Sequence, residues 1–153
     1  GHAVVGGREA MQERRGGFDG VIVAIGDNRA RLEVAGWLKA QGFALQSVVH
    51  PAAVVAPSAT LGAGVLVMPG AVVNAEARIG DNAIINTGAI VEHDCEVGAG
   101  VHVAPGVVLC GGACIGAGTL VGAGAVVLPG VRVGESLLVK AGTVVARNLE
   151  KDD

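Results

Sequence analysis

The chain has 153 residues, enough for one domain with a small annex, and it carries a net charge of −3 without any stretch rich in lysine or arginine. This charge excludes the basic face on which nucleic-acid binding depends, and no run of about eighteen apolar residues predicts a membrane span. The sequence does not open on a basic segment followed by an apolar one, and its three cysteines make no even disulfide framework, so we expect no signal peptide and a reducing, cytoplasmic location.

The N-terminal part of the chain predicts a β-α-β unit. Residues 21–25 are a short apolar run between two glycines, which is typical of a buried strand. Asp27 or Asn28 is expected to cap the helix that follows, and Gly42 to end it. Residues 45–49 predict a second strand, parallel to the first and reached by a right-handed crossover.

The sequence changes character near residue 50, because the two phenylalanines and the single tryptophan all precede this point. We therefore predict three parts: a nucleotide-binding-like region at 1–50, a repeat domain at 51–149 and a polar tail at 150–153. A β-α-β unit alone cannot bury both faces of its sheet, and a complete nucleotide-binding domain would start with another strand and a glycine turn. The N-terminal region is therefore expected to be truncated, and the polar end after Val145 indicates a shortened C-terminus as well.

A six-residue repeat occupies the rest of the chain. From Val55 to Val145, every sixth residue is Val, Ile or Leu, with no insertion. Four residues after each comes a second small or aliphatic residue, and the residue before that one is usually glycine. Neither a helix nor a plain strand has this period, which indicates a hexapeptide β-helix with one short strand and one turn per hexad.

A second period sets the size of each coil. Three hexads make one triangular coil, and the residues from Val55 to Val144 make five coils. The predicted fold is thus mainly β, a parallel β-helix of about five coils preceded by the small β-α-β region. The glycines that recur every eighteen residues are Gly62, Gly80, Gly98, Gly116 and Gly134.

The repeat contains two histidines, His93 and His102, and only the first is followed by an acid, Asp94. His93 falls at a turn, outside the inward-facing series. At a corner, adjacent side chains need not point to opposite faces, so Asp94 can accept from one ring nitrogen and leave the other as a base. Spacing alone leaves open a second interpretation, a solvated histidine beside a solvated acid.

Two further side chains lie close to His93 in the sequence. Asn86 lies one hexad before the hexad that contains His93, and it either satisfies a turn or binds a substrate hydroxyl or amine near that histidine. Cys95 belongs to the inward-facing small series and is expected to fill the core.

These residues resemble a known family. The eleven residues from Ile85 to Cys95 read INTGAIVEHDC, and His102 opens the stretch HVAPG. Both closely resemble the sugar O/N-acyltransferases of the sialic-acid and bacillosamine type. Residues 24–31 and 50–53 also match this family, so the resemblance covers about residues 20–149.

The resemblance implies a left-handed β-helix and a homotrimer with active sites between subunits. It implies acetyl-CoA as the acetyl donor, without a metal, and an acceptor that is most often a nucleotide-linked amino sugar. We therefore expect an N-acetyltransferase acting on a UDP- or GDP-linked 4-amino-4,6-dideoxy sugar, with the nucleotide held by the N-terminal region.

The resemblance also implies roles for individual residues. His93 matches the general base and Asp94 the acid that orients it, while Asn86 and His102 match residues lining the acceptor and acetyl end of the site. The positions whose backbone would meet the coenzyme are Gly111, Ala123 and Ala141. Direct transfer is expected, with the Gly111 N–H stabilising the oxyanion and no covalent acyl-enzyme.

The sequence leaves three alternatives open. A hexapeptide carbonic anhydrase needs three histidines converging on zinc, and this repeat has two. A non-catalytic β-helix scaffold has no need for a His-Asp corner. Among transferases, the acceptor is alternatively a sialic-acid hydroxyl or a small amino acid.

Overall fold

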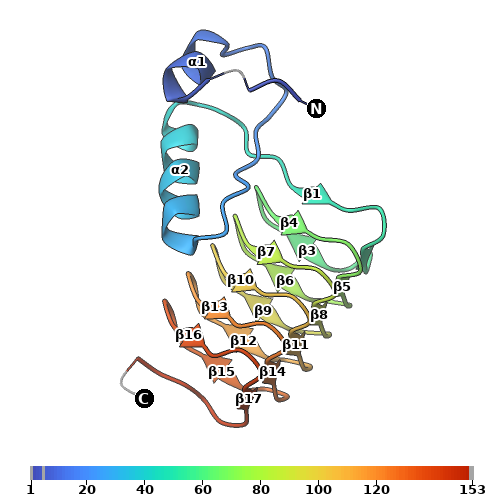
Figure 1. Ribbon diagram of the computed structural model, residues 1–153. Helices are drawn as coiled ribbons and strands as arrows, with labels where there is room; N and C mark the ends of the chain where they lie inside the picture. Colours follow the sequence, from blue (N-terminus) through green and yellow to red (C-terminus); the bar gives the residue numbers. More distant parts are fainter. Residues whose placement is uncertain (1, 5, 152–153) are drawn as a thin grey trace.

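The computed structural model describes residues 2–4 and 6–151, so residues 152–153 of the predicted polar tail lie outside the described chain. The chain forms a three-sided parallel β-helix with a long helix alongside its coils and a shorter helix beyond the first coil (Figure 1). This is the mainly β fold that the hexads predict, with the expected count of about five coils. Its strand order is consistent with the left-handed winding that the resemblance implies.

Each side of the prism is a sheet of two-residue strands, stacked in parallel one coil apart. The β1 sheet contains, in order, β1 (Val48–Val49), β4 (Leu66–Val67), β7 (Ile84–Ile85), β10 (His102–Val103), β13 (Leu120–Val121) and β16 (Leu138–Val139). The β2 sheet contains β2 (Val54–Val55), β5 (Val72–Val73), β8 (Ile90–Val91), β11 (Val108–Leu109), β14 (Val126–Val127) and β17 (Val144–Val145). The β3 sheet contains β3 (Thr60–Leu61), β6 (Arg78–Ile79), β9 (Glu96–Val97), β12 (Cys114–Ile115) and β15 (Arg132–Val133).

The core of the prism consists of the two series that the hexads predict to face inward. The side chain of the second residue of each strand points into the prism, and Ile85 and Leu109 are fully buried in this way. The small series fills the space beside it, where Ala89 and Cys95 are also fully buried. Because each hexad buries the same two positions, adding coils extends one continuous apolar core.

The glycines with the eighteen-residue period all lie at the corner between the β3 and β1 sheets. A Cβ atom on Gly116 would lie 2.5 Å from the carbonyl carbon of Gly134, and one on Gly80 would lie 2.6 Å from the nitrogen of Ala99. Real Cβ atoms do not approach backbone atoms so closely, because well-packed interiors leave no such space. This glycine period therefore marks the corner at which the next coil leaves no room for a side chain.

The N-terminal segment contains α1 (Arg8–Glu13) and α2 (Asn28–Ala40), and α2 runs alongside the coils (Figure 1). As predicted, the Asp27 carboxylate caps α2, accepting the Ala30 N–H at 2.7 Å. Gly42, with a φ of 77°, follows the end of the helix.

The two predicted N-terminal strands are shorter than expected. Val21 forms a single parallel bridge with Leu45, so the parallel relation is present, but Ile22 remains 37% exposed. The prediction of a buried strand over 21–25 is thus wrong, because this run lies at an edge where no second described strand pairs with it. Residues 48–49 instead form β1, which pairs with β4 and begins the β-helix within the region predicted as 1–50.

Within the described part of the chain, neither helix has the length and apolar character needed to cross a membrane.

Candidate active site

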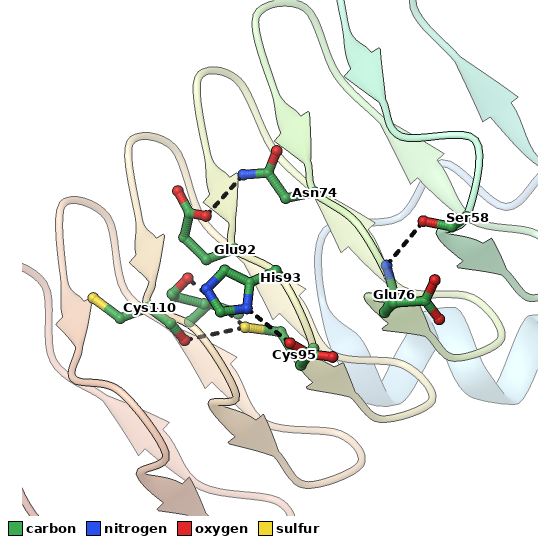
Figure 2. Close-up of polar contacts among 9 residues, drawn as sticks. Ser58, Asn74, Glu76, Glu92, His93, Cys95 and Cys110 are labelled. Atoms are coloured by element: carbon green, nitrogen blue, oxygen red, sulfur yellow. Dashed lines mark hydrogen bonds and ion pairs between the residues drawn. The ribbon is translucent and has the colours of Figure 1, made fainter.

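His93 and Asp94 lie on the turn between β8 and β9, at the corner between the β2 and β3 sheets. Figure 2 shows His93 at this corner, near Glu92 and Cys95. The turn is tied to both neighbouring coils, since the Asp94 N–H donates to Ala75 O at 3.0 Å and the Gly112 N–H donates to His93 O at 2.9 Å. Between these anchors, His93 Nδ1–H donates to the Asp94 carboxylate over 2.7 Å. The contact that the sequence predicts for this corner is therefore present.

Asp94 adopts an unusual backbone conformation for its residue type. Its φ of 59° lies in the left-handed region, and most other turns of the β-helix place glycine at this position. Such a conformation costs free energy in a residue with a side chain, and it persists where the side chain has a role. Here the side chain holds His93, which a glycine would not do.

Gly111, one coil further on, lies directly against the imidazole of His93. A Cβ atom on Gly111 would lie 2.8 Å from both Cε1 and Nε2 of His93. The ring therefore rests on a glycine surface, with Nε2 on that side. The Gly111 N–H donates to no acceptor within the described residues, so a donor is available beside the candidate base.

The electrostatic surroundings favour a charged His93. The hydrogen bond to Asp94 raises the pKa of His93 above its usual value, with further contributions from the charges of Asp94 and Glu92 and an opposing effect of desolvation. Because the Asp94 carboxylate accepts a hydrogen bond from Nδ1–H, Nε2 of the neutral ring carries the free lone pair. Both side chains are 64% exposed, so a substrate can reach them.

The residues on either side of the His93–Asp94 pair, Glu92 and Cys95, are also held by hydrogen bonds. The Glu92 carboxylate accepts a hydrogen bond at 3.0 Å from Nδ2 of Asn74, which lies one coil earlier, and this bond fixes the position of the carboxylate (Figure 2). Cys95 is fully buried, as predicted, and donates its thiol proton to the Cys110 carbonyl at 3.2 Å. Burial raises the pKa of Cys95 to about 11, so this thiol is unsuited to act as a nucleophile.

Asn86 and His102 form a second polar pair, with Asn86 on the turn between β7 and β8. The Asn86 amide donates from Nδ2 to His102 Nε2 over 3.0 Å, while Asn86 Oδ1 accepts the Thr87 N–H at 2.8 Å. His102 Nδ1 lies 3.2 Å from the Gly26 carbonyl, which can only accept. His102 is therefore the neutral Nδ1–H tautomer, and burial lowers its pKa.

The two pairs lie at different corners of the same chain. Asn86 belongs to the corner between the β1 and β2 sheets, whereas His93 belongs to the corner between the β2 and β3 sheets. No hydrogen bond among the described residues joins the two pairs. One chain therefore assembles His93, Asp94 and Gly111 at one corner, and Asn86 with His102 at the other.

The remaining predicted site residues lie at the Asn86 corner. Ala123 and Ala141 occupy the turns that follow β13 and β16, one coil apart, and both are exposed. Their N–H groups donate to no acceptor among the described residues. The three positions predicted to meet the coenzyme thus present unpaired N–H groups, with Gly111 at one corner and the two alanines at the other.

Arg31 ends the stretch 24–31 that resembles the family, but sequence reasoning assigned it no role. Its side chain is 1% exposed and reaches the Gly26 carbonyl that His102 also contacts. The available signal was helical spacing, because Arg31 precedes the buried Ala35 by four residues and Leu38 by seven.

A metal centre is not built into this site. The described residues contain no group of three or more His, Cys, Asp or Glu side chains placed to hold a metal ion.

Comparison with known proteins relates this geometry to characterised enzymes. The profile of the family described as "Bacterial transferase hexapeptide (six repeats)" matches residues 76–111. Comparison with curated proteins returned no match. Among solved structures, a mutant of perosamine N-acetyltransferase from Caulobacter crescentus, in complex with CoA and GDP-perosamine, is 47% identical with a TM-score of 0.93. The match covers 95% of this chain and 70% of that one.

Two further structures are similar. PerB from Caulobacter crescentus, in complex with CoA and GDP-perosamine, is 47% identical over 93% of this chain and 69% of that chain, with a TM-score of 0.90. The acetyltransferase domain of PglB from Neisseria gonorrhoeae is 39% identical over 86% of this chain and 64% of that chain, with a TM-score of 0.85. The chain therefore belongs to the hexapeptide-repeat sugar acyltransferases.

Proposed function

We propose that the protein transfers the acetyl group of acetyl-CoA to the amino group of a nucleotide-linked 4-amino-4,6-dideoxy sugar. The observation that carries this proposal is the His93–Asp94 pair, whose Nε2 faces a glycine with an unpaired N–H. The similar enzyme from Caulobacter crescentus, which was solved with CoA and GDP-perosamine, supports both the donor and the acceptor class.

The geometry suggests direct transfer. The sugar amine attacks the thioester carbonyl while His93 Nε2 removes its proton, and Asp94 stabilises the imidazolium that forms. The Gly111 N–H donates to the carbonyl oxygen as it becomes negative, an effect worth roughly 2.7–4 kcal/mol for one such donor. The carbon–sulfur bond then breaks, and the CoA thiolate leaves with the proton from His93.

We further propose a homotrimer, supported by the distribution of apolar residues on the outer faces. The outward residues of the β3 sheet are mostly polar, and the apolar outward series of the β1 sheet is interrupted by His102. Those of the β2 sheet are all Val or Ile, and Val54 and Val144 at its two ends are each 62% exposed. A continuous apolar face of this kind calls for a partner surface. The outward residues of the β2 sheet are Val54, Val72, Ile90, Val108, Val126 and Val144.

This face also suggests how two corners form one site. The β2 sheet is bounded on one side by the Asn86 corner and on the other by the His93 corner. If three β2 faces surround a three-fold axis, the His93 corner of each subunit meets the Asn86 corner of the next. We propose that the segment before β1 holds the nucleotide, beside the β-helix that forms the transferase domain. The three free cysteines fit a reducing location such as the cytoplasm.

The function is tested by measuring CoA release from acetyl-CoA against GDP- and UDP-linked 4-amino sugars, with the matching 4-hydroxy sugars as controls. Acetylation of an amino sugar alone is the expected result, and His93→Ala should lower kcat/KM by about 10²–10⁴-fold. Full activity of His93→Ala on the best acceptor would contradict the proposal.

A further inference from the structure

Arg31 is a buried arginine whose hydrogen-bonding capacity is completely used. A guanidinium has five N–H donors, and each of the five meets an oxygen. No carboxylate takes part, so backbone and amide oxygens solvate the buried charge. The acceptors are Asn82 O at 2.8 Å from Nε, Ile25 O and Gly26 O at 2.8 and 3.1 Å from Nη1, and Asn28 Oδ1 and Gly100 O at 2.7 and 2.8 Å from Nη2.

These acceptors come from separate parts of the chain. Asn82 and Gly100 are turn residues of two successive coils, while Ile25 and Gly26 end the segment that leads into α2. Asn28 extends the same contact to a third coil, donating to Gly118 O at 2.9 Å. Burying a charge is costly, and an apolar side chain would attach α2 to the prism at a lower cost. The arginine is thus suited to fixing the positions of particular carbonyl groups.

The Gly26 carbonyl connects this cluster to the candidate site. It accepts from Arg31 Nη1 and also faces His102 Nδ1, at 3.2 Å. Since a carbonyl only accepts, it places the His102 proton on Nδ1, and Nε2 is left to accept from Asn86. Asn86 Oδ1 accepts from Thr87, and Asn86 Nδ2 has His102 as its one partner among the described residues. One of the two amide hydrogens of Asn86 therefore has no acceptor in the described chain.

We infer that Arg31 is a positioning residue: by fixing the Gly26 carbonyl it holds His102 as the Nδ1–H tautomer and directs the free Asn86 amide hydrogen toward a substrate oxygen. This inference rests on the proposed function only in taking His102 and Asn86 as part of the acceptor site. The hydrogen-bond chain Arg31–Gly26–His102–Asn86 crosses from the N-terminal region to the β-helix. Contacts between these two parts therefore orient the Asn86 N–H that the proposed acceptor site presents.

The first test uses the unmodified protein. Nitrogen-15 NMR of the imidazoles at neutral pH distinguishes the two neutral tautomers of histidine, and the His102→Gln variant assigns the His102 signals. We expect the Nδ1–H form of His102 alone. A dominant Nε2–H form would overturn the inference. This measurement needs no substrate, so it stays decisive even if no nucleotide sugar is acetylated.

The second test compares Arg31→Lys with a matched control. Lysine keeps the charge but supplies three donors instead of five, so Gly26 and His102 should lose their fixed positions. We expect kcat/KM to fall about 10- to 100-fold and the tautomer signals of His102 to broaden or split. Lys39→Met is the control, because Lys39 also joins α2 to the prism, through an ion pair with Asp81 at 2.7 Å. No hydrogen bond or ion pair among the described residues joins Lys39 to Arg31, Gly26, His102 or Asn86. This control should change kcat/KM by less than about twofold.

A double-mutant cycle separates positioning from general support of the fold. If Arg31 acts through His102, Arg31→Lys should have little further effect on kcat/KM in a His102→Ala background. Equal losses in both backgrounds, or unchanged His102 signals in Arg31→Lys, would show that Arg31 only attaches the helix. Circular dichroism of each variant confirms that folded proteins are compared.

Discussion

At the scale of single residues, Gly111 leaves room for the imidazole ring of His93, whose Nε2 is the proposed base. A methyl group on Gly111 would stand 2.8 Å from Nε2, whereas the backbone at this position is not in the left-handed region. Gly111→Ala should therefore displace the ring rather than strain the main chain. Because His93 is exposed and can swing away, we expect kcat to fall at least about tenfold while the free energy of unfolding changes by less than about 1 kcal/mol.

His93→Ala provides the control for that prediction, because it removes the group with which the methyl collides. In the His93→Ala background, Gly111→Ala should leave the residual kcat nearly unchanged. A second loss as large as the first would mean that the methyl group acts on the coenzyme or on the backbone instead.

Asp94→Asn tests the electrostatic role of the acid. The Asp94 carboxylate raises the pKa of His93, and the base must be neutral to accept a proton. Removing the negative charge should lower that pKa, so the acidic limb of the pH profile of kcat/KM should move to lower pH while the maximum rate falls. The measurement is kcat/KM from pH 5 to 9, with Glu76→Gln as a control that removes an acid from the preceding coil at the same turn position.

The direction of the change in the pKa of His93 also determines how Asp94→Asn affects stability. A raised pKa of His93 stabilises the folded state fully below the pKa of His93 in the unfolded chain, and this contribution is lost as pH rises through the higher folded value. Since the ion pair is 64% exposed on both sides, the midpoint of thermal unfolding should hardly move. An acidic limb that stays in place, or moves to higher pH, would show that Asp94 does not set the protonation of His93.

Residue-scale prediction succeeded where a contact is local and failed where it joins distant segments. His93 and Asp94 are neighbours, and a six-residue period indicates that they fall at a corner, so their contact follows from the sequence. Arg31 contacts carbonyl groups 51 and 69 residues away. Its charge argues against burial unless those carbonyls are known to converge, and no sequence pattern states that they do.

At the scale of elements, the corner between the β3 and β1 sheets leaves little room for side chains at Gly80, Gly98 and Gly116. Gly116→Ala would place a Cβ 2.5 Å from the Gly134 carbonyl carbon and 2.6 Å from the Glu135 nitrogen. Backbone atoms cannot rotate away, so we expect a loss of about 1–3 kcal/mol in the free energy of unfolding, measured by urea denaturation. Gly36→Ala is the control with the opposite sign, because a Cβ there meets nothing within 4 Å in a helix and should stabilise by about 0.5–1 kcal/mol.

The sequence predicts an element well when its pattern also marks the elements that the element contacts. Each strand of the β-helix pairs with a strand eighteen residues away, so the repeat that marks one strand also marks its partners. The apolar run at 21–25 indicates only that burial is favourable, and carries no sign of whether a neighbouring strand is present. That is why the hexads predict strand positions correctly, while the N-terminal run reduces to one bridge between Val21 and Leu45.

At the scale of the whole molecule, the proposed trimer depends on the β2 face. Val108 lies within this face, on β11. Val108→Glu should disrupt the proposed trimer because it would bury an unpaired carboxylate in the interface. Sedimentation should show smaller species, and activity should fall in parallel. Thr60→Glu, on the outer face of the β3 sheet, is the control and should leave both properties unchanged.

The division of the site between subunits is tested by mixing inactive variants. His93→Ala retains an intact Asn86–His102 corner, and His102→Ala retains an intact His93–Asp94 corner. If each site takes one corner from each of two subunits, random co-assembly of the two variants restores roughly a quarter of the native sites, and activity should recover to about that level. Mixing His93→Ala with Asp94→Asn gives the matched control, because both changes affect the same corner and no intact copy of it can form. If mass spectrometry shows mixed assemblies and the first pair still fails to recover activity, the two corners do not share a site.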